Sequence, residues 1–172
     1  MNNKQSFEFD NQASSISSFS HQLLECLVSR LMNHHHDGQL LFKARYIIGE
    51  LLNNAVKHSG CSKTVFTLTI ENDCLTIDKV DEGTKLELMN KASYLKNGVP
   101  TLIMADGLHE LYITKESDQL LSFFCREPQN EEVTIQHLHE HMGLLIIAKA
   151  ADRFTYSFNS PVNTFTATVN LS

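Results

Sequence analysis

Hydrophobic and polar positions along this 172-residue chain recur with periods that predict an ordered series of strands and helices. Residues 5–10 (QSFEFD) alternate between polar and apolar side chains, as a short strand does. The Ser-rich stretch ASSISSFS then offers N-caps for a helix that extends to about residue 32. A second amphipathic helix is predicted from about residue 39 to residue 58, with Ser59-Gly60 as its C-terminal stop.

Hairpin patterns follow the second helix and close the chain. TVFTLTI (64–70) and CLTIDKV (74–80), separated by END, predict a β-hairpin. LLIIAKAAD (144–152) predicts a short buried helix, and FTYSF (154–158) with TFTATVNL (164–171) predicts a final hairpin around the turn NSPVN. Because neither a repeat nor a linker divides the chain, we expect one domain over residues 1–172. Its expected fold class is α+β, a two-layer α/β sandwich with helices on one face of a mixed, mostly antiparallel sheet.

Residues 84–140 have the least regular pattern. KLELMNKASYLK (85–96) favours a helix, NGVP (97–100) a turn, and LYITKESDQLLSFF (111–124) a hairpin. The polar stretch REPQNEEVTIQHLHEH (126–141) is typical of a mobile segment. We therefore expect an enlarged insertion, or lid, at about 84–140 that adds strands, binds a partner or covers a pocket.

Composition and charge exclude several functional classes. The net charge is −6, from 14 basic and 20 acidic residues, and no basic cluster is present, which argues against a nucleic-acid partner. No two of the four cysteines form a C-x-x-C pair, so they are expected to be free thiols in a reducing compartment. The start of the chain lacks the apolar core of a signal peptide, and no apolar run approaches the roughly 20 residues of a membrane span. We expect a cytoplasmic protein without a membrane partner.

The second predicted helix carries a polar face that helix propensity does not explain. Its two adjacent asparagines, Asn53 and Asn54, are poor helix formers. At 100° per residue, Glu50, Asn54 and Lys57 fall together with Tyr46, opposite the apolar face. An amide oxygen suits Mg²⁺ coordination, and a carboxylate one turn away suits proton abstraction. The alternative is a solvated helix face whose polar residues bind nothing in particular.

The stretch ELLNNAVKHSG, from Glu50 to Gly60, resembles the N-box of the GHKL superfamily, which includes gyrase, the heat-shock chaperone ATPases, histidine kinases and MutL. The nearest likeness is to the ATPase domain of histidine kinases and to stand-alone anti-sigma-factor serine kinases. This resemblance implies a Bergerat-type ATP-binding fold, with ATP and Mg²⁺ as ligands. It implies that Asn54 binds Mg²⁺ together with the nucleotide phosphates, and that Glu50 is the catalytic base or positions water. Lys57 and His58 would approach the phosphates.

The first glycine motif of that family corresponds to Asp81-Glu82-Gly83-Thr84-Lys85, directly after a predicted strand. The resemblance implies that Asp81 accepts a hydrogen bond from the adenine amino group. Gly83 would adopt a positive φ and bring the backbone close to the base. Lys85 stands where the family has its second glycine.

The second glycine motif corresponds to His141-Met142-Gly143, at the start of the predicted buried helix. Gly143 would lie at the phosphates, where backbone N–H groups and the helix dipole favour an anion. His141 replaces the first glycine of this motif. From the last strand, Asn163 or Thr164 would lie near the adenine.

The resemblance therefore implies a regulatory protein kinase that transfers phosphoryl groups to Ser, Thr or His on a separate partner protein, in a protein that could form a homodimer. The replacements at Lys85 and His141 keep a second hypothesis open, a degenerate and non-catalytic domain that binds a regulatory partner. Two histidine clusters, His34–His36 and His137, His139 and His141, raise the alternative of a zinc site. Their spacing is more typical of polar loop residues.

Overall fold

A computed structural model gives the structure of residues 3–31, 38–91, 94–128 and 141–171. Its strands are β1 (Lys4–Phe9), β2 (Thr64–Glu71), β3 (Cys74–Asp81), β4 (Thr101–Ala105), β5 (Glu110–Ser117), β6 (Leu120–Arg126), β7 (Arg153–Asn159) and β8 (Val162–Asn170). Its helices are the 3-10 helix η1 (Ala13–Ser15) and the α-helices α1 (Ile16–Leu31), α2 (Gly38–His58), α3 (Glu87–Lys91) and α4 (Met142–Ala150).

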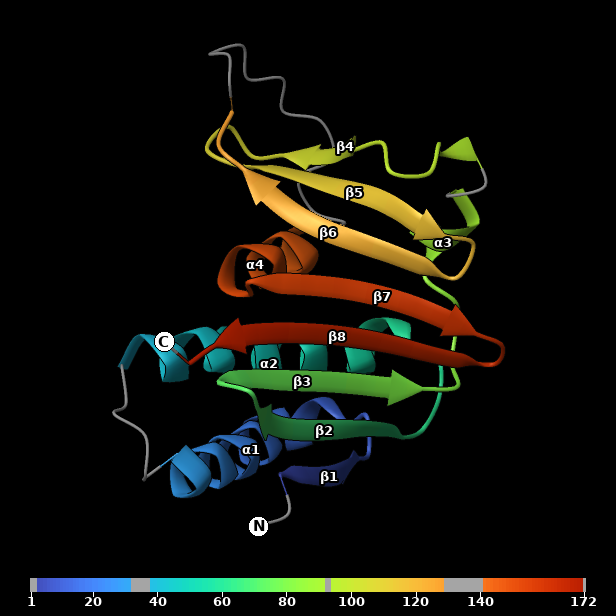
Figure 1. Cartoon of the computed structure of the whole chain (residues 1–172). Helices are drawn as coiled ribbons and strands as arrows, with labels where there is room; N and C mark the ends of the chain where they lie inside the picture. The colour runs from blue at the N-terminus through green and yellow to red at the C-terminus, as the bar shows by residue number, and fades with distance from the viewer. Residues whose placement is uncertain (1–2, 32–37, 92–93, 129–140, 172) are drawn as a thin grey trace.

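The strands form one sheet in the order β1-β2-β3-β8-β7-β6-β5-β4 (Figure 1). Each pair of neighbouring strands is antiparallel. The pairing of β3 with β8 joins the N-terminal hairpin to the C-terminal one, and it sets Asp81 opposite Asn163. This register brings two polar side chains from distant parts of the sequence to one end of the central strands.

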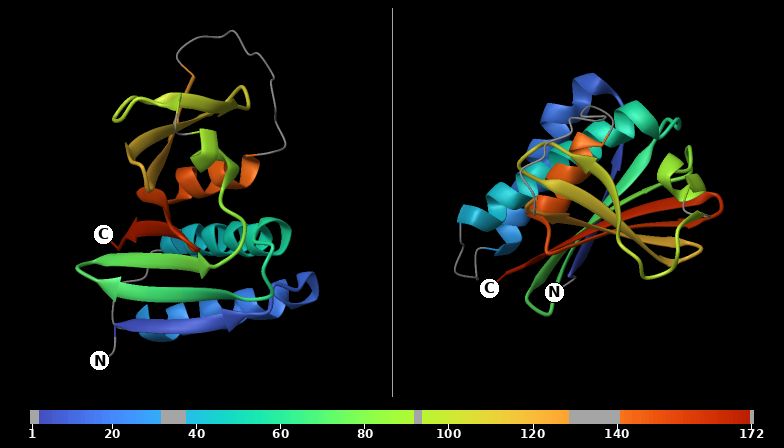
Figure 2. Two further views of the ribbon diagram at one scale, coloured as in Figure 1. Left: turned by 90° about the vertical axis from the view of Figure 1, so that its right-hand side faces the viewer. Right: turned by 90° about the horizontal axis from the view of Figure 1, so that it is seen from above.

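Helix α2 lies between α1 and α4 and packs against the middle of the sheet (Figures 1 and 2). Its apolar stripe explains this position, because Ala44, Ile48, Leu51 and Leu52 are all buried. Strand β3 is amphipathic as well, because every second residue from Leu75 to Asp81 is buried. The last two buried positions of β3 are charged, which marks this end of the strand as different from an ordinary core.

The expected fold class, a two-layer α/β sandwich with a mixed sheet, is wrong. Strands hold more of the described residues than helices do, and all named strand pairs in them are antiparallel. The reason lies in residues 84–128, which we expected to be part of an insertion. These residues form the strands β4, β5 and β6. Because β6 pairs with β7, they extend the sheet by three strands. In Figure 1, β4 and β5 extend past α4, so the helices do not form a full second layer.

Most locally periodic elements are confirmed within a few residues, including both long helices and the hairpins β2–β3, β5–β6 and β7–β8. The helix expected over 85–96 is wrong in length, because α3 covers Glu87–Lys91 only. Strand β4 was not predicted. The polar segment 129–140, with His137 and His139, and the cluster His34–His36 lie outside the described residues.

Candidate functional site

The C-terminal end of α2 is joined to the end of β3 by a close backbone contact. Ser59 is buried, its carbonyl oxygen accepts a hydrogen bond from the Thr84 N–H (2.5 Å), and its hydroxyl donates to the Ala55 carbonyl. A Cβ on Gly83 would lie 1.6 Å from the Ser59 carbonyl oxygen, so only glycine fits there. Gly60 follows with a φ of 69°, which allows α2 to end and the chain to turn. These contacts fix the polar end of α2 beside the polar end of β3.

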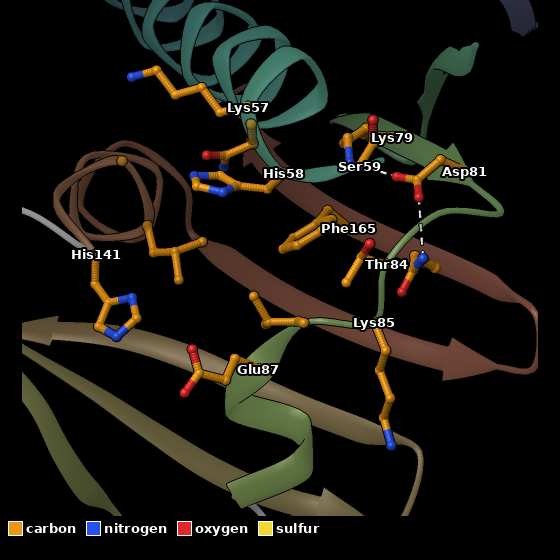
Figure 3. A pocket seen from close by; sticks show the side chains of 15 residues that line it. Lys57, His58, Ser59, Lys79, Asp81, Thr84, Lys85, Glu87, His141 and Phe165 are labelled. Carbon is orange, nitrogen blue, oxygen red and sulfur yellow. Dashed lines mark hydrogen bonds and ion pairs between the residues drawn. The ribbon is translucent and has the colours of Figure 1, made fainter. Parts of the chain in front are cut away.

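A cavity of about 540 Å³ opens beside this junction. Its walls come from five elements and one connection: the end of α2, the end of β3, the start of α3, the start of β8, the first turn of α4 and the segment between β3 and α3 (Figure 3). The lining residues are Asn54, Lys57, His58, Ser59, Lys79, Asp81, Thr84, Lys85, Leu86, Glu87, His141, Gly143, Leu144, Asn163 and Phe165.

One end of the cavity is formed by a buried ion pair. Lys79 Nζ lies 2.5 Å from Asp81 Oδ2, and their side chains are 3% and 1% exposed. Asp81 Oδ1 accepts hydrogen bonds from the Gly83 N–H (2.9 Å) and from Asn163 Nδ2 (3.0 Å). The Lys79 ammonium also lies 5.0 Å from the centre of the Phe165 ring, within cation–π range.

The hydrogen-bond network continues from Asn163 into the core. Tyr156 donates its hydroxyl proton to Asn163 Oδ1 (2.6 Å), and Asn163 Nδ2 also donates to the Gly83 carbonyl (3.1 Å). The Leu86 N–H in turn donates to the Tyr156 hydroxyl (3.0 Å). Every polar atom of the Asn163 side chain therefore has a protein partner, as buried polar groups require.

The other side of the cavity is formed where the first turn of α4 packs on the polar face of α2. A Cβ on Gly143 would lie 2.8 Å from Glu50 Oε2 and 3.7 Å from Asn54 Oδ1. A glycine at this position thus lets α4 approach the two polar side chains closely. Burial raises the pKa of the half-buried Glu50 carboxyl above its ordinary value, and the charge of Lys57 partly opposes that rise.

Two lysines on opposite sides of the cavity, Lys57 and Lys85, favour an anion. Within the described part of the chain, neither Lys57 nor Lys85 has a carboxylate at ion-pair distance. His58 and His141 add two imidazoles, and His141 points toward Glu87 in Figure 3. A hydrogen bond from Lys91 chiefly lowers the pKa of the Glu87 carboxyl, so Glu87 is ionised and paired at neutral pH. The cavity wall therefore offers positive charge to an anion in a chain whose net charge is −6.

The structure brings six of the predicted site residues together on the cavity wall: Asn54, Lys57, His58, Asp81, Gly143 and Asn163. Glu50 is not a lining residue and lies beside the cavity, against Gly143. Thr164 is not a lining residue either, because strand alternation turns it away from the face of Asn163 and Phe165.

The positive φ expected at Gly83 is wrong. Gly83 is not among the glycines with a positive φ, which are Gly60, Gly98 and Gly107 in the described residues. Its close approach to the Ser59 carbonyl explains the glycine instead.

Sequence reasoning missed Lys79, Tyr156 and Phe165. For Lys79 a signal was available, because the period of β3 assigns it to the same face as Leu75 and Ile77. A lysine on the buried face of a strand, two residues before an aspartate, predicts a buried ion pair. Tyr156 and Phe165 look like ordinary core aromatics in sequence, and only the register of β7 with β8 brings them to the site.

No protein-family model matches this chain, and no curated protein matches it. Among the described residues, no helix is both long and apolar enough to cross a membrane. Those residues also hold no group of three or more His, Cys, Asp or Glu side chains placed to bind a metal ion.

Proposed function

We propose that the cavity binds a nucleoside triphosphate with Mg²⁺, and that the protein is a regulatory kinase that phosphorylates a separate protein. One observation carries this proposal. The stretches around Asn54, Asp81 and Gly143, far apart in sequence, meet on the wall of a single cavity. Its volume of about 540 Å³ lies in the range typical of small-molecule sites. The GHKL resemblance, which implies ATP, was drawn from these same stretches.

The region between α2 and α4 supports the binding of the phosphates. Lys57, near the end of α2, supplies positive charge without a carboxylate partner in the described structure. The first turn of α4 adds backbone N–H groups that have no acceptor within the helix. A triphosphate placed here would be attracted by both, whereas an uncharged ligand would gain from neither.

The donor set fits Mg²⁺ that is bound mainly through phosphates. The Asn54 side chain lines the cavity beside Gly143, so a hard oxygen ligand faces the place proposed for the phosphates. Mg²⁺ would neutralise charge on the transferred phosphoryl group. Asn54 would hold the cation without adding a negative charge of its own.

Glu50 is the proposed general base. It lies one helical turn before Asn54, and burial raises its pKa, which makes its carboxylate a better proton acceptor than a solvated one. It would accept the proton of the partner's hydroxyl group as the phosphoryl group is transferred. The charge of Lys57 opposes the rise in the pKa of Glu50, and so favours the ionised carboxylate that accepts a proton.

A thermal-shift titration tests nucleotide binding. A ligand at 100 times its dissociation constant adds about 2.7 kcal/mol to the free energy of unfolding, which raises the Tm of a protein of this size by about 5–11 °C. Asn54→Ala should abolish the dependence of this shift on Mg²⁺. Asn53→Ala is the matched control, because Asn53 neighbours Asn54 but does not line the cavity, and it should preserve the dependence. No shift with any nucleoside triphosphate at millimolar concentration would reject the proposal.

Phosphoryl transfer needs its own test. Glu50→Gln removes the proton acceptor but keeps the shape of the side chain, so the variant should bind nucleotide as the wild type does and lose turnover. Turnover is measured as phosphate release or as label transferred to a partner from the same cells. Full turnover in Glu50→Gln would reject Glu50 as the base.

A second candidate function, a non-catalytic domain that binds a partner, is favoured by a different surface. Four exposed large apolar side chains lie on the segment around the edge strand β4: Tyr94, Val99, Leu102 and Leu108. Tyr94 and Leu108 are 90% and 72% exposed. Exposed apolar residues beside an unpaired strand edge are typical of binding surfaces. A folded protein without any nucleotide-induced shift would support this function instead.

A further inference from the structure

The Lys79 ammonium is buried at a position where a strand of this kind has an apolar side chain. It follows Leu75 and Ile77 on the inward face of β3, and its side chain is only 3% exposed. Burying an ammonium group is costly even when it is paired, and replacing a buried ion pair as a whole with apolar residues of similar size is often neutral or stabilising. Packing therefore does not account for this lysine, although it does account for its neighbours.

The ammonium group retains hydrogen-bonding capacity toward the cavity. A lysine has three N–H donors. One is directed to Asp81 Oδ2, and the Phe165 ring lies 5.0 Å away as a π partner. No further acceptor for Lys79 exists among the described residues, and Lys79 is part of the cavity wall. A ligand at this end of the cavity would meet an N–H group that can still donate.

The side-chain oxygens of Asp81 and Asn163 at the same end already accept hydrogen bonds from protein groups. Asp81 Oδ1 accepts two hydrogen bonds and Oδ2 accepts one, and the side chain is 1% exposed. The Asn163 oxygen accepts the Tyr156 hydroxyl, and its nitrogen donates to Asp81 and to the Gly83 carbonyl. A ligand group that donates a hydrogen bond would thus meet, on Asp81 and Asn163, oxygens that already accept from protein groups, and it would face an ammonium ion.

We infer that Lys79 makes this site selective for a nucleotide with a 6-oxopurine base, such as inosine or guanosine triphosphate, over one with adenine; this inference rests on the proposed function. A 6-oxopurine presents O6 and N7 as adjacent acceptors, and lysine pairs well with that edge. Adenine presents its 6-amino group at the same position, where it would face the Lys79 ammonium as donor against donor. The Phe165 ring supplies an apolar surface on which either base can stack.

The test compares the magnesium complexes of inosine and adenosine triphosphate by isothermal titration calorimetry on the full chain. Near Lys79 these two nucleotides differ only at position 6 and the adjacent ring nitrogen. The inosine nucleotide is expected to bind about tenfold tighter or more, the discrimination typical of one well-placed base contact. Equal affinity, or tighter binding of the adenosine nucleotide, overturns the inference and leaves the proposed function standing. Binding of neither nucleotide overturns both.

Lys79→Met assigns the preference to this side chain. The variant removes the donor and frees Asp81 Oδ2 to accept a hydrogen bond from an amino group, so the affinity ratio should fall to one or reverse. Lys85→Met is the matched control, because Lys85 lines the cavity elsewhere and lies over the Phe158 ring. It should weaken both nucleotides alike and preserve their ratio. An unchanged ratio in folded Lys79→Met overturns the inference, and where that variant does not fold, the wild-type ratio decides.

Discussion

Replacing Gly83 with alanine tests whether the junction between α2 and β3 holds the site together. The added Cβ would lie 1.6 Å from the Ser59 carbonyl oxygen and 2.5 Å from its carbon, which are backbone atoms that cannot rotate away. The two segments must therefore separate, and the hydrogen bond from the Thr84 N–H to the Ser59 carbonyl is lost. Overpacking of this kind costs about 1–3 kcal/mol and a hydrogen bond about 1 kcal/mol, so the expected loss is about 2–4 kcal/mol.

Urea denaturation followed by circular dichroism measures this loss, and the Tm should fall by about 4–16 °C. Gly49→Ala is the matched control. A Cβ at Gly49 meets nothing within 4 Å, and alanine is the better helix former, so this variant should gain up to about 1 kcal/mol. If Gly83→Ala were as stable as the wild type while Gly49→Ala behaved as expected, the close backbone contact described at Ser59 would be refuted.

Two further substitutions test the electrostatics of the site. Asp81→Asn leaves Lys79 buried without its anionic partner, so unfolding experiments should show a loss of about 3–5 kcal/mol in the free energy of unfolding. Asp78→Asn, at a partly buried residue of the same strand, is the control and should cost clearly less stability. Equal losses in the two variants would contradict the buried ion pair. Glu50→Gln should stabilise the protein at pH 7, because burial raises the pKa of Glu50 in the folded state above its ordinary value of 4.5 and so penalises the charged form. That gain should disappear as the pH falls through 4.5, where both states are protonated, and a gain that is constant from pH 4 to pH 7 would contradict the raised pKa.

Local periodicity was sufficient to predict the elements that build the site. Helix α2 and the β2–β3 hairpin have strong amphipathic patterns, and both lie within two residues of their expected bounds. The same pattern placed Asn54 and Lys57 on the polar face that borders the cavity. The bounds of a helix or strand, and the face that each residue occupies, could therefore be predicted, because both depend on residues that are close in sequence.

Long-range pairing could not be predicted in the same way. The strand pair β6–β7 joins residues on either side of the segment 129–140, and nothing in the local sequence of Leu120–Arg126 specifies that partner. The role of Asp81 was inferred from a motif, whereas its actual environment depends on Lys79 and on Asn163 from β8. Motif spacing identifies which residues meet, but it does not show which hydrogen bonds they have already made.

A crystal structure of the chain with Mg²⁺ and a non-hydrolysable inosine triphosphate analogue tests the central claim most directly. We expect the nucleotide in the cavity, with its base between Lys79 and Phe165 and its phosphates near Asn54 and the first turn of α4. An empty cavity at saturating nucleotide, or a nucleotide bound elsewhere on the chain, would contradict the assignment of this cavity as the nucleotide site.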